Sequence, residues 1–337
     1  MRGFYFIYSP ADTLCRFFIT SLDITLQRLQ EATRVCGHVP RTCFQRAVTC
    51  IEIHRHELQI DKVIARFRPP FSMIDTDKPN PADILHTVFQ LHRTPGSSTL
   101  VEAHVRPVSE IAKKKIDAYV KSQSAKHRYE FYLRMRSLSP AYAGTMFEDA
   151  VHACLKTITK PERFILHSLE DESTLEINFS PDISFETFTS MAMFTTLLEK
   201  AVSEKKSCYL QPAIPNHASF DSYLYLHDMN QDLGTLFFVQ TTGGREHPIA
   251  ISGCMRAQTA LPPKTLLKRF RPSKDHKWDI VFIVPEDTAA PFRQQRFVVP
   301  ENTAAKKKKN MKDTWVSKTT QYVLRLPVQR AMGVDDS

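Results

Sequence analysis

The chain has 337 residues, of which 42% are apolar, and a formal net charge of +9. It contains no apolar run of the roughly 18 residues that a membrane-spanning helix needs, which excludes an integral helical membrane protein. A chain of this length and composition is expected to bury a large core and to form two domains rather than one.

Most of the positive charge lies in the first part of the chain. Residues 1–140 contain 21 Lys and Arg against 13 Asp and Glu, whereas residues 141–337 contain 24 against 23. A basic bias of this kind suits a polyanionic partner such as nucleic acid, although it also keeps a protein in solution.

Two features indicate an intracellular protein. The apolar N-terminal stretch is interrupted by Ser9, Pro10, Asp12 and Arg16, so we expect no secretory signal peptide. The seven cysteines are odd in number and include no CxxC pair, which is typical of a reduced compartment.

The first 140 residues are predicted to be mostly helical. Apolar spacing and turn residues predict helices over 21–36, 42–67, 82–93 and 109–137. Gly37 is the expected C-cap of the first helix.

From Gly144 onward the pattern changes to a mixture of helices and strands. We predict helices over 144–156, 191–200 and 249–261. The predicted strands cover 163–169, 174–180, 184–188, 219–226, 234–241, 278–285 and 321–327. The predicted fold class is therefore α/β, with a helical region over 1–140 and a mixed α/β domain over 141–330.

Several common catalytic signatures are absent from the sequence. None of the nine glycines lies in the GxxxxGK(S/T) pattern that cradles phosphate, so nucleotide hydrolysis by this chain alone is not expected. The GxSxG nucleophile elbow and the usual zinc-binding spacings are also absent.

Three polar residues of the second half remain as candidates. Asp221 precedes the apolar segment SYLYL, Gln240 closes the next apolar strand, and Glu148 lies on a preceding helix. Adjacent strands would bring Asp221 and Gln240 together, and a helix packed on the sheet could bring Glu148 to the same place. Oxygen ligands of this kind suit Mg²⁺ or Mn²⁺, which polarise a phosphate and activate water.

This order of residues resembles the PD-(D/E)xK restriction-endonuclease-like nucleases. More specifically, residues 140–327 resemble the C-terminal region of Crinkler and retrotransposon-hot-spot type proteins. The similar segments are GTMFEDAVHACL, YLQPAIPNHASFDSYLYL, LFFVQTTGGREHPI, WDIVFIVPE and QYVLRLP. In those proteins a P-loop NTPase is followed by a restriction-endonuclease-like domain, and CGHVPRTCF resembles a turn near the end of the NTPase part.

The resemblance implies roles for particular residues. Asp221 and Gln240 would bind Mg²⁺ or Mn²⁺ together with the backbone carbonyl of Thr241, and Glu148 would act as a further ligand or as a base. Thr242 stands where the catalytic lysine of the family is expected.

This departure from the family pattern has two consequences. The transition-state charge needs another donor, for which Arg245 and His247 are the nearest candidates in the sequence. A glutamine in place of an acid also removes one negative charge, so the affinity for a divalent cation should be lower.

Two basic stretches complete the set of candidate residues. The stretch 264–277 follows a predicted helix and is expected to contact nucleic-acid phosphates through Lys264, Lys268, Arg269, Arg271, Lys274 and Lys277. The run Lys306–Lys309 fits a nuclear localisation signal or a phosphate clamp, but a solvated loop between two strands is the commoner outcome.

The sequence therefore predicts an intracellular, metal-dependent nuclease acting on nucleic acid, with DNA favoured over RNA. The rival hypothesis is a non-catalytic nucleic-acid- or protein-binding module on the same fold. A third is that the chain is a truncated product whose missing N-terminal half, or an NTPase-bearing partner, is needed for activity.

A plainer interpretation of these polar residues stays open at this point. Asp221 could be an exposed strand-edge residue, Gln240 a satisfied amide, and 241–244 a simple turn.

Overall fold

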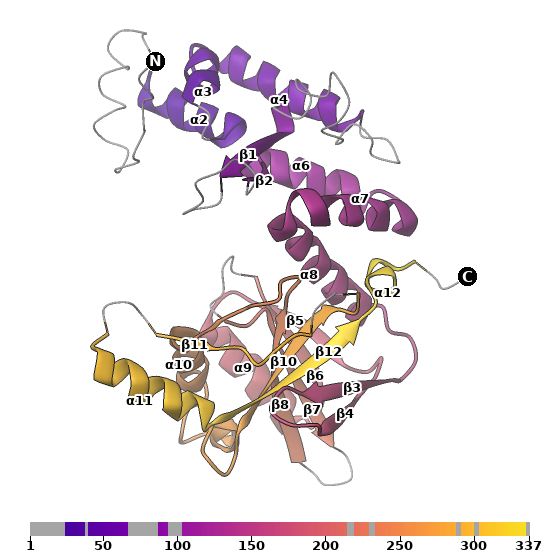
Figure 1. The fold of residues 1–337 in the computed structure, drawn as a ribbon, viewed down its shortest axis with the longest axis vertical. Coiled ribbons are helices and arrows are strands. Elements are labelled where there is room, and N and C mark those ends of the chain that lie inside the picture. Colours follow the sequence, from indigo (N-terminus) through magenta and orange to yellow (C-terminus); the bar gives the residue numbers. More distant parts are fainter. Residues whose placement is uncertain are drawn as a thin grey trace. The chain divides into compact units, whose positions relative to one another are not determined.

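The structure is a computed structural model, and it divides the chain into two compact units, Met1–Tyr142 and Ala143–Ser337 (Figure 1). The sequence placed the corresponding boundary after residue 140. The structure describes residues 24–37, 40–66, 87–93, 103–213, 219–228, 233–287, 291–299 and 303–334.

The described part of the first unit is mostly helical, with one β-hairpin. Its elements are α2 (Leu26–Cys36), α3 (Pro40–Arg46), α4 (Cys50–Ile64), β1 (Phe89–Arg93), β2 (Ala103–Pro107), α6 (Glu110–Lys121) and α7 (Ala125–Leu138). As expected, Gly37 follows the first of these helices as its C-cap. The predicted Pro-rich break over 67–81 lies outside the described residues.

The prediction of a helix over 82–93 is wrong for its last five residues. They form β1, which pairs antiparallel with β2 so that Leu91 lies opposite Val105. The partner strand is ten residues away along the chain, and a local apolar pattern carries no information about such pairing. Residues 82–86 lie outside the described residues.

Two helices predicted as continuous are each broken by a capping residue. Between α3 and α4, Thr49 accepts a hydrogen bond from the backbone N–H of Glu52 at 3.2 Å and starts a new helix. Between α6 and α7, Ser124 caps His127 in the same way at 3.3 Å. Both residues are preferred N-caps, and apolar periodicity alone does not show where such a cap interrupts a helix.

The second unit is built on an eight-stranded mixed sheet. Its strands are β3 (Glu162–Ser168), β4 (Thr174–Phe179), β5 (Ser184–Phe188), β6 (Cys208–Pro212), β7 (Ser222–Asp228), β8 (Leu233–Thr241), β10 (Trp278–Pro285) and β12 (Thr319–Leu326). The strands lie in the order β4-β3-β12-β10-β8-β7-β6-β5. Of these eight strands, seven were predicted and β6 was missed.

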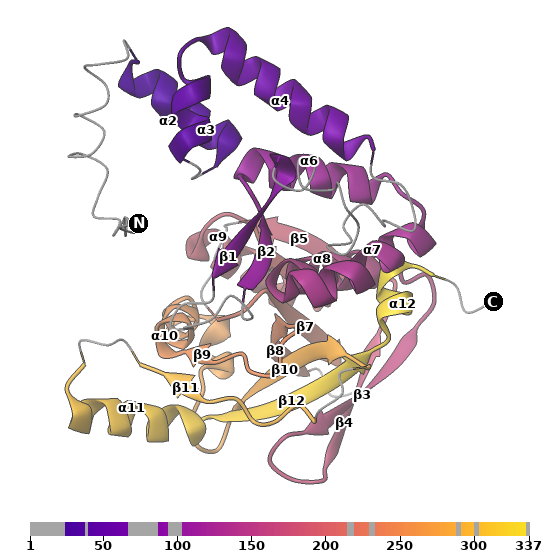
Figure 2. The same cartoon turned by 45° about the horizontal axis from the view of Figure 1, so that its top comes forward.

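The centre of the sheet is parallel and its flanks are mixed. β8, β10 and β12 run parallel to one another, as Figure 2 shows, while β6, β7 and β8 form an antiparallel meander. A separate short pair, β9 (Ile249–Ala250) and β11 (Phe297–Val298), also runs parallel. The coarse prediction of a mixed α/β domain is therefore confirmed.

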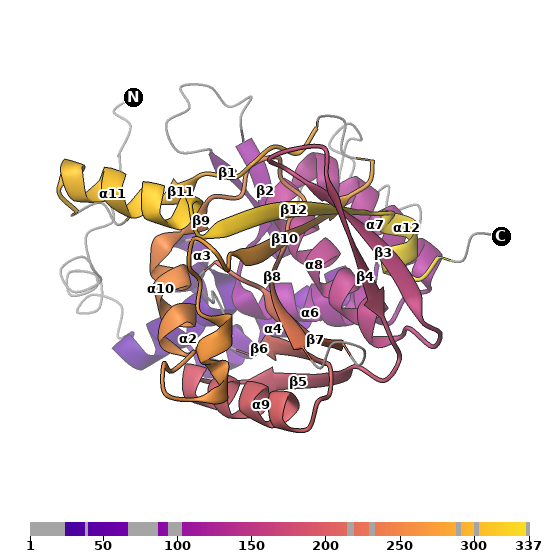
Figure 3. The same cartoon turned by 90° about the horizontal axis from the view of Figure 1, so that it is seen from below.

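Helices cover both faces of the sheet (Figure 3). The helical elements of this unit are α8 (Pro140–Lys156), α9 (Met191–Ser203), α10 (Ile251–Thr259), the 3₁₀ helix η3 (Leu266–Phe270), α11 (Ala305–Val316) and α12 (Val328–Met332). Residues of α9, α10, η3 and α11 join one large apolar cluster with the sheet. On the other face, Leu155 of α8 lines a small cavity with residues of β6, β7, β8 and β10.

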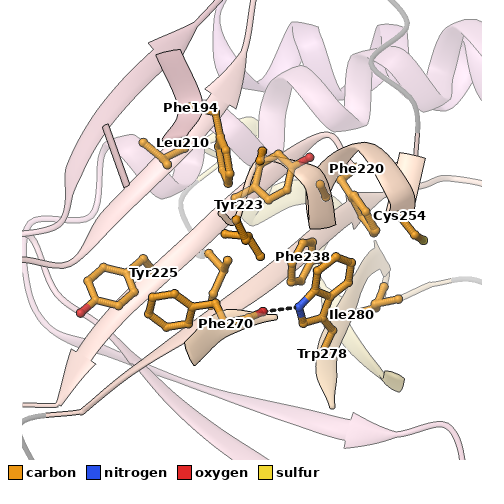
Figure 4. Packing of buried hydrophobic residues seen from close by; sticks show 14 of the residues in the cluster. Phe194, Leu210, Phe220, Tyr223, Tyr225, Phe238, Cys254, Phe270, Trp278 and Ile280 are labelled. Atoms are coloured by element: carbon orange, nitrogen blue, oxygen red, sulfur yellow. Dashed lines mark hydrogen bonds between the residues drawn. The ribbon is translucent and has the colours of Figure 1, made fainter. Parts of the chain in front are cut away.

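Aromatic rings fill the larger cluster (Figure 4). Phe238 of β8 stacks on Trp278 of β10 with ring centroids 4.0 Å apart, and Tyr223 of β7 lies beside Phe238 at 5.5 Å. The indole N–H of Trp278 donates to the carbonyl of Phe270 at 2.6 Å, so the only polar atom of this buried ring is satisfied. The strand that begins at Trp278 is thereby fixed against η3.

The prediction of a loop for Lys306–Lys309 is wrong, because these residues belong to α11. Trp315 is buried against Trp278, with centroids 5.4 Å apart, and Met311 packs against the same core one turn earlier. Lysine is a good helix former, so two apolar anchors four residues apart are enough to fix the helix with its lysines outside. Among the described helices, none combines the length and the apolar character needed to cross a bilayer.

Gly37→Ala is expected to destabilise the first unit. The backbone of Gly37 has φ +71° and ψ −161°, a region that other residues rarely adopt, and an added methyl group would collide with the carbonyl group of Val108. We expect the free energy of unfolding to fall by about 2–4 kcal/mol in urea denaturation followed by circular dichroism.

Gly144→Ala is the matched control, since a methyl group there meets no heavy atom within 4 Å and the residue lies within α8. It should leave stability unchanged or raise it by up to about 1 kcal/mol. Equal effects of the two substitutions would contradict the described backbone at Gly37.

Candidate functional site

Asp221 and Gln240 are in direct contact. Asp221 precedes β7, whose register with β8 pairs Ser222 with Val239, so Asp221 comes to lie opposite Gln240. The Oδ2 atom of Asp221 accepts a hydrogen bond from Gln240 Nε2 at 2.6 Å and another from the backbone N–H of Thr241 at 2.8 Å. The polar end of this core strand is therefore occupied by one carboxylate and its two donors.

The contact lies at the carboxyl end of the central parallel strands. Gln240 pairs with Phe282 of β10, and the backbone N–H of Thr242 continues the ladder by donating to the carbonyl of Ile283 at 3.0 Å. The carboxyl ends of parallel strands are a common position for ligand sites in α/β proteins, because loops rather than core side chains surround them.

Burial dominates the electrostatics of Asp221. Burial raises the pKa of its carboxyl to about 6, although the hydrogen bonds from Thr241 and Gln240 each oppose this rise. A carboxylate that stays partly protonated near neutral pH gains from any additional positive charge beside it.

Two buried side-chain oxygens of the donor residues are unsatisfied. Gln240 and Thr241 are each 4% exposed, and Gln240 Oε1 and Thr241 Oγ1 have no hydrogen-bond partner within the part of the chain that the structure describes. Buried polar atoms normally have partners, so each exception requires an explanation. A hard cation that takes oxygen ligands is one such explanation, and this donor set of carboxylate, amide and backbone oxygens fits Mg²⁺ or Mn²⁺.

Glu148 lies on the helix that approaches the same end of β8. Gly243, two residues beyond β8, packs against the second turn of α8, since a Cβ on Gly243 would lie 3.4 Å from the Cα of Gly144. Glu148 is one turn further along α8. The pKa of the buried Tyr209 hydroxyl is raised, mainly by its desolvation. The carboxylates of Asp221 and Glu148 both add to this rise. Both acids are thus close enough to this buried hydroxyl group to act on it electrostatically.

A chain of buried hydrogen bonds runs from Ser222, the residue after Asp221, to His152, which lies one turn from Glu148 on α8, and the sequence did not reveal it. Ser222 Oγ donates to the Tyr209 hydroxyl at 2.6 Å, and the Tyr209 hydroxyl contacts His152 Nδ1 at 2.7 Å. His152 Nε2 lies 4.0 Å from Glu148 Oε1. The available signal was the i,i+4 spacing of Glu148 and His152, but Tyr209 comes from the missed strand β6.

The direction of these bonds follows from the Ser222 hydroxyl at their start. With Ser222 donating to it, the Tyr209 hydroxyl donates its own hydrogen to Nδ1, which leaves the His152 proton on Nε2, facing the Glu148 carboxylate. Burial lowers the pKa of His152 to about 4, so the ring is neutral at pH 7. His152 therefore presents a neutral N–H group toward Glu148.

The contacts of Thr242 and His247 lead away from Asp221. The Thr242 hydroxyl accepts from the backbone N–H of Gly244 at 3.1 Å and so closes a turn. The backbone N–H of His247 donates to Gln295 Oε1 at 2.5 Å, and burial lowers the pKa of the His247 ring. The structure thus brings Asp221, Gln240 and Thr241 together, with Glu148 nearby, and gives Thr242 and His247 turn and loop contacts.

The basic stretch 264–277 leads into the opposite end of the sheet. Lys277 precedes Trp278, the first residue of β10, whereas Gln240 pairs with Phe282 four residues later, a separation of about 13 Å along the strand. Lys264, Lys268, Lys274 and Lys277 are exposed.

The two arginines of this stretch have structural contacts. Arg271 Nη1 donates to the carbonyls of Gln258 at 2.9 Å and Leu261 at 2.6 Å, at the C-terminal end of α10. Arg269 Nη2 donates to the Tyr225 hydroxyl at 3.3 Å. Arg271 therefore stabilises the end of a helix, whereas Arg269 and the four lysines of the stretch are exposed.

Comparison with known proteins does not identify the chain: no family model matches it, and no curated protein or solved structure is significantly similar to it. Among the described residues, no three His, Cys, Asp or Glu side chains converge in the way that would hold a metal ion by themselves. Any metal at Asp221 would consequently depend on amide and backbone oxygens in addition to carboxylates.

Asp221→Asn is expected to change how stability depends on pH. The folded-state pKa of Asp221 is about 6 and the ordinary value is 3.8, so between these values the folded state binds the proton and the unfolded state releases it. Raising the pH through this window therefore destabilises the wild type, by up to about 3 kcal/mol, and the variant lacks this loss.

The measurement is urea unfolding at several pH values between about 4 and 7 with a chelator present. The variant should become more stable relative to wild type as the pH rises. A difference that does not change with pH would contradict the burial of this carboxyl.

Tyr209→Phe is expected to change the tautomer of His152. In the wild type, long-range ¹H–¹⁵N spectra of the histidine rings should show a single Nε2–H form for His152, because the Tyr209 hydroxyl donates to Nδ1. Without that donor, both tautomers should be populated. Tyr322→Phe, at a half-buried tyrosine of β12, is the control and should leave the spectrum of His152 unchanged. An Nδ1–H form in the wild type would reverse the direction assigned to these bonds.

Proposed function

We propose that this protein is a metal-dependent nuclease of the PD-(D/E)xK type, related to the Crinkler and retrotransposon-hot-spot proteins. The observation that carries the proposal is the contact of Asp221 with Gln240 and Thr241 at the carboxyl end of β8, where two buried oxygens lack partners. Residues separated in the sequence meet there in the arrangement that the resemblance implies.

The order of elements supports the proposal. α9 is followed by the antiparallel meander of β6, β7 and β8, then by α10 and by β10, which runs parallel to β8. The same order of helix, strands, helix and strand was predicted from the apolar patterns of this half. Gln240 lies in the last strand of the meander, and Asp221 immediately precedes the middle one.

Each residue of the site has a chemical task in this proposal. Asp221, Gln240 and the Thr241 carbonyl would hold Mg²⁺ or Mn²⁺, which polarises a phosphodiester and lowers the pKa of a bound water. Gln240 would turn its amide so that Oε1, now without a partner, faces the cation instead of Nε2. Glu148 would act as a further ligand or would accept a proton from the attacking water.

One observation favours a second candidate function. Thr242 occupies the position of the expected lysine, and its hydroxyl is engaged in a turn with Gly244 rather than directed at Asp221. A site of this kind would bind nucleic acid or protein without cleaving, as a non-catalytic member of the same family. If cleavage occurs, Arg245 or His247 must supply the missing charge.

The remaining expectations from the sequence stay proposals. They are an intracellular and nuclear location, DNA as the preferred polymer, and dependence on an NTPase-bearing partner or on a missing N-terminal half. The exposed side chains of Lys306, Lys307 and Lys309 on α11 are compatible with recognition by a nuclear import receptor.

The test is cleavage of supercoiled plasmid and single-stranded RNA by the full chain in Mg²⁺ or Mn²⁺. Asp221→Ala should abolish metal-dependent cleavage, because it removes the one carboxylate that contacts both Gln240 and Thr241. Asp279→Ala is the matched control: burial also raises the pKa of Asp279 to about 6, but the residue lies near the opposite end of β10. The control should retain cleavage.

Two results would decide against the nuclease. Absence of cleavage in the wild type with either metal and either polymer would favour the binding module. Cleavage that persists in Asp221→Ala at the wild-type rate would show that the activity does not come from this site.

A further inference from the structure

Two loop segments beside the candidate site are tied together by one glutamine. The first, 242–249, follows β8, and the second, 291–298, contains Gln295 and β11. Gln295 Oε1 accepts from the backbone N–H of His247 at 2.5 Å, and Gln295 Nε2 donates to the carbonyls of Arg245 at 3.3 Å and Arg293 at 2.6 Å. One side chain thus holds the backbone of both segments.

Gln295 is itself fixed to the sheet. Its backbone N–H donates to Gln321 Oε1 at 2.7 Å, and Gln321 Nε2 donates back to the carbonyl of Gln295 at 2.9 Å. Gln295 is 6% exposed and Gln321, in β12, is 1% exposed. All four polar atoms of Gln295 and both side-chain polar atoms of Gln321 are therefore hydrogen-bonded. Rearranging such a buried network is costly. The position of the two segments is therefore set by the sheet.

We call these hydrogen bonds of Gln295 the clamp. Three arginines lie in the two segments that it connects. Arg245 and Arg293 are held through their carbonyls by Gln295, and the carbonyl of Arg296 accepts from the backbone N–H of Ile249 at 3.0 Å, where β9 and β11 pair. All three arginines are exposed and form no ion pair with another described residue. Glu246 is the one acidic residue in the two segments, so together they carry a net positive charge.

We propose that Arg245, Arg293 and Arg296 form a phosphate-binding surface that holds the backbone of a nucleic acid beside the Asp221 site. The first segment begins at Thr242, directly after Thr241, so this surface adjoins the site through the chain itself. The inference rests on the proposed function only in taking a nucleic acid as the polyanion.

Several features favour phosphate over other anions. Guanidinium groups bind phosphate oxygens with paired hydrogen bonds, and they are less strongly hydrated than ammonium groups. A backbone fixed by buried hydrogen bonds reduces the disorder that binding must remove. Val298 is the one large apolar side chain exposed in the two segments, so they offer little of the apolar surface that anchors protein interfaces or membrane-bound helices.

The lysines of 264–277 provide a matched comparison. Lys264, Lys268 and Lys274 are also exposed, and they carry the same total charge, but their stretch leads into the opposite end of the sheet. If only net charge attracted the polymer, either set would contribute equally. If the clamped arginines contact phosphates, only their removal should change the number of ions released on binding.

The test is binding of labelled duplex DNA and single-stranded RNA to the full chain, in the Asp221→Ala background and with a chelator, followed by fluorescence anisotropy at several salt concentrations. Replacing the three arginines by glutamine should weaken binding by about tenfold or more at 0.1 M salt and lower the salt slope by roughly 2–3. Replacing the three lysines by glutamine should change affinity less than about threefold.

A second variant tests the clamp while keeping every arginine. Gln295→Met preserves the volume of the side chain and removes its three side-chain hydrogen bonds, so affinity should fall while the circular dichroism spectrum stays unchanged. If this variant unfolds, the arginine and lysine variants still decide the question.

Three results would overturn the inference. These are equal losses in the arginine and lysine variants, an unchanged salt slope in the arginine variant, and stronger binding to polyglutamate or to anionic lipid vesicles than to nucleic acid. Because binding is measured without metal, a protein that binds through the arginines but never cleaves would refute the nuclease and leave this surface intact.

Discussion

The organisation of the second unit depends on how the Asp221 carboxylate is accommodated between two core strands. A buried carboxylate is stable only with donors beside it, and here β8 supplies both, through the Gln240 side chain and the Thr241 backbone. A slip of β7 against β8 by one residue would separate Asp221 from these donors. The requirement that pins this strand pair also places a charged group, with unsatisfied oxygens around it, at the carboxyl end of the central strands.

Two further groups of side chains adjoin the Asp221 contact. The Ser222, Tyr209 and His152 hydrogen bonds run from the residue after Asp221 to the helix that bears Glu148. The Gln295 clamp fixes the loop that follows Thr241. Each is buried and each starts from a neighbour of the Asp221 contact. Such support is what distinguishes a site held in one geometry from a polar strand end that faces solvent.

Much of the second unit could be predicted from its sequence, because its signals are local. Apolar runs between turn residues gave the strands, and their order brought Asp221 beside Gln240. The missed features depend on partners far along the chain. The Gln295–Gln321 pair joins residues 26 positions apart, and α11 depends on a contact between Trp315 and Trp278. The same reason applies to β1 in the first unit. The apolar pattern of its residues also fits a helix, and only their pairing with β2 makes them a strand.

The most direct test of the central claim is whether a divalent cation binds at Asp221. In the ¹⁵N-labelled full chain, a small proportion of Mn²⁺ should selectively broaden the side-chain amide signal of Gln240 and the backbone signal of Thr241, and Asp221→Ala should abolish this effect. Unchanged Gln240 and Thr241 signals, with broadening elsewhere or nowhere, would show that the buried oxygens beside Asp221 do not form a metal site.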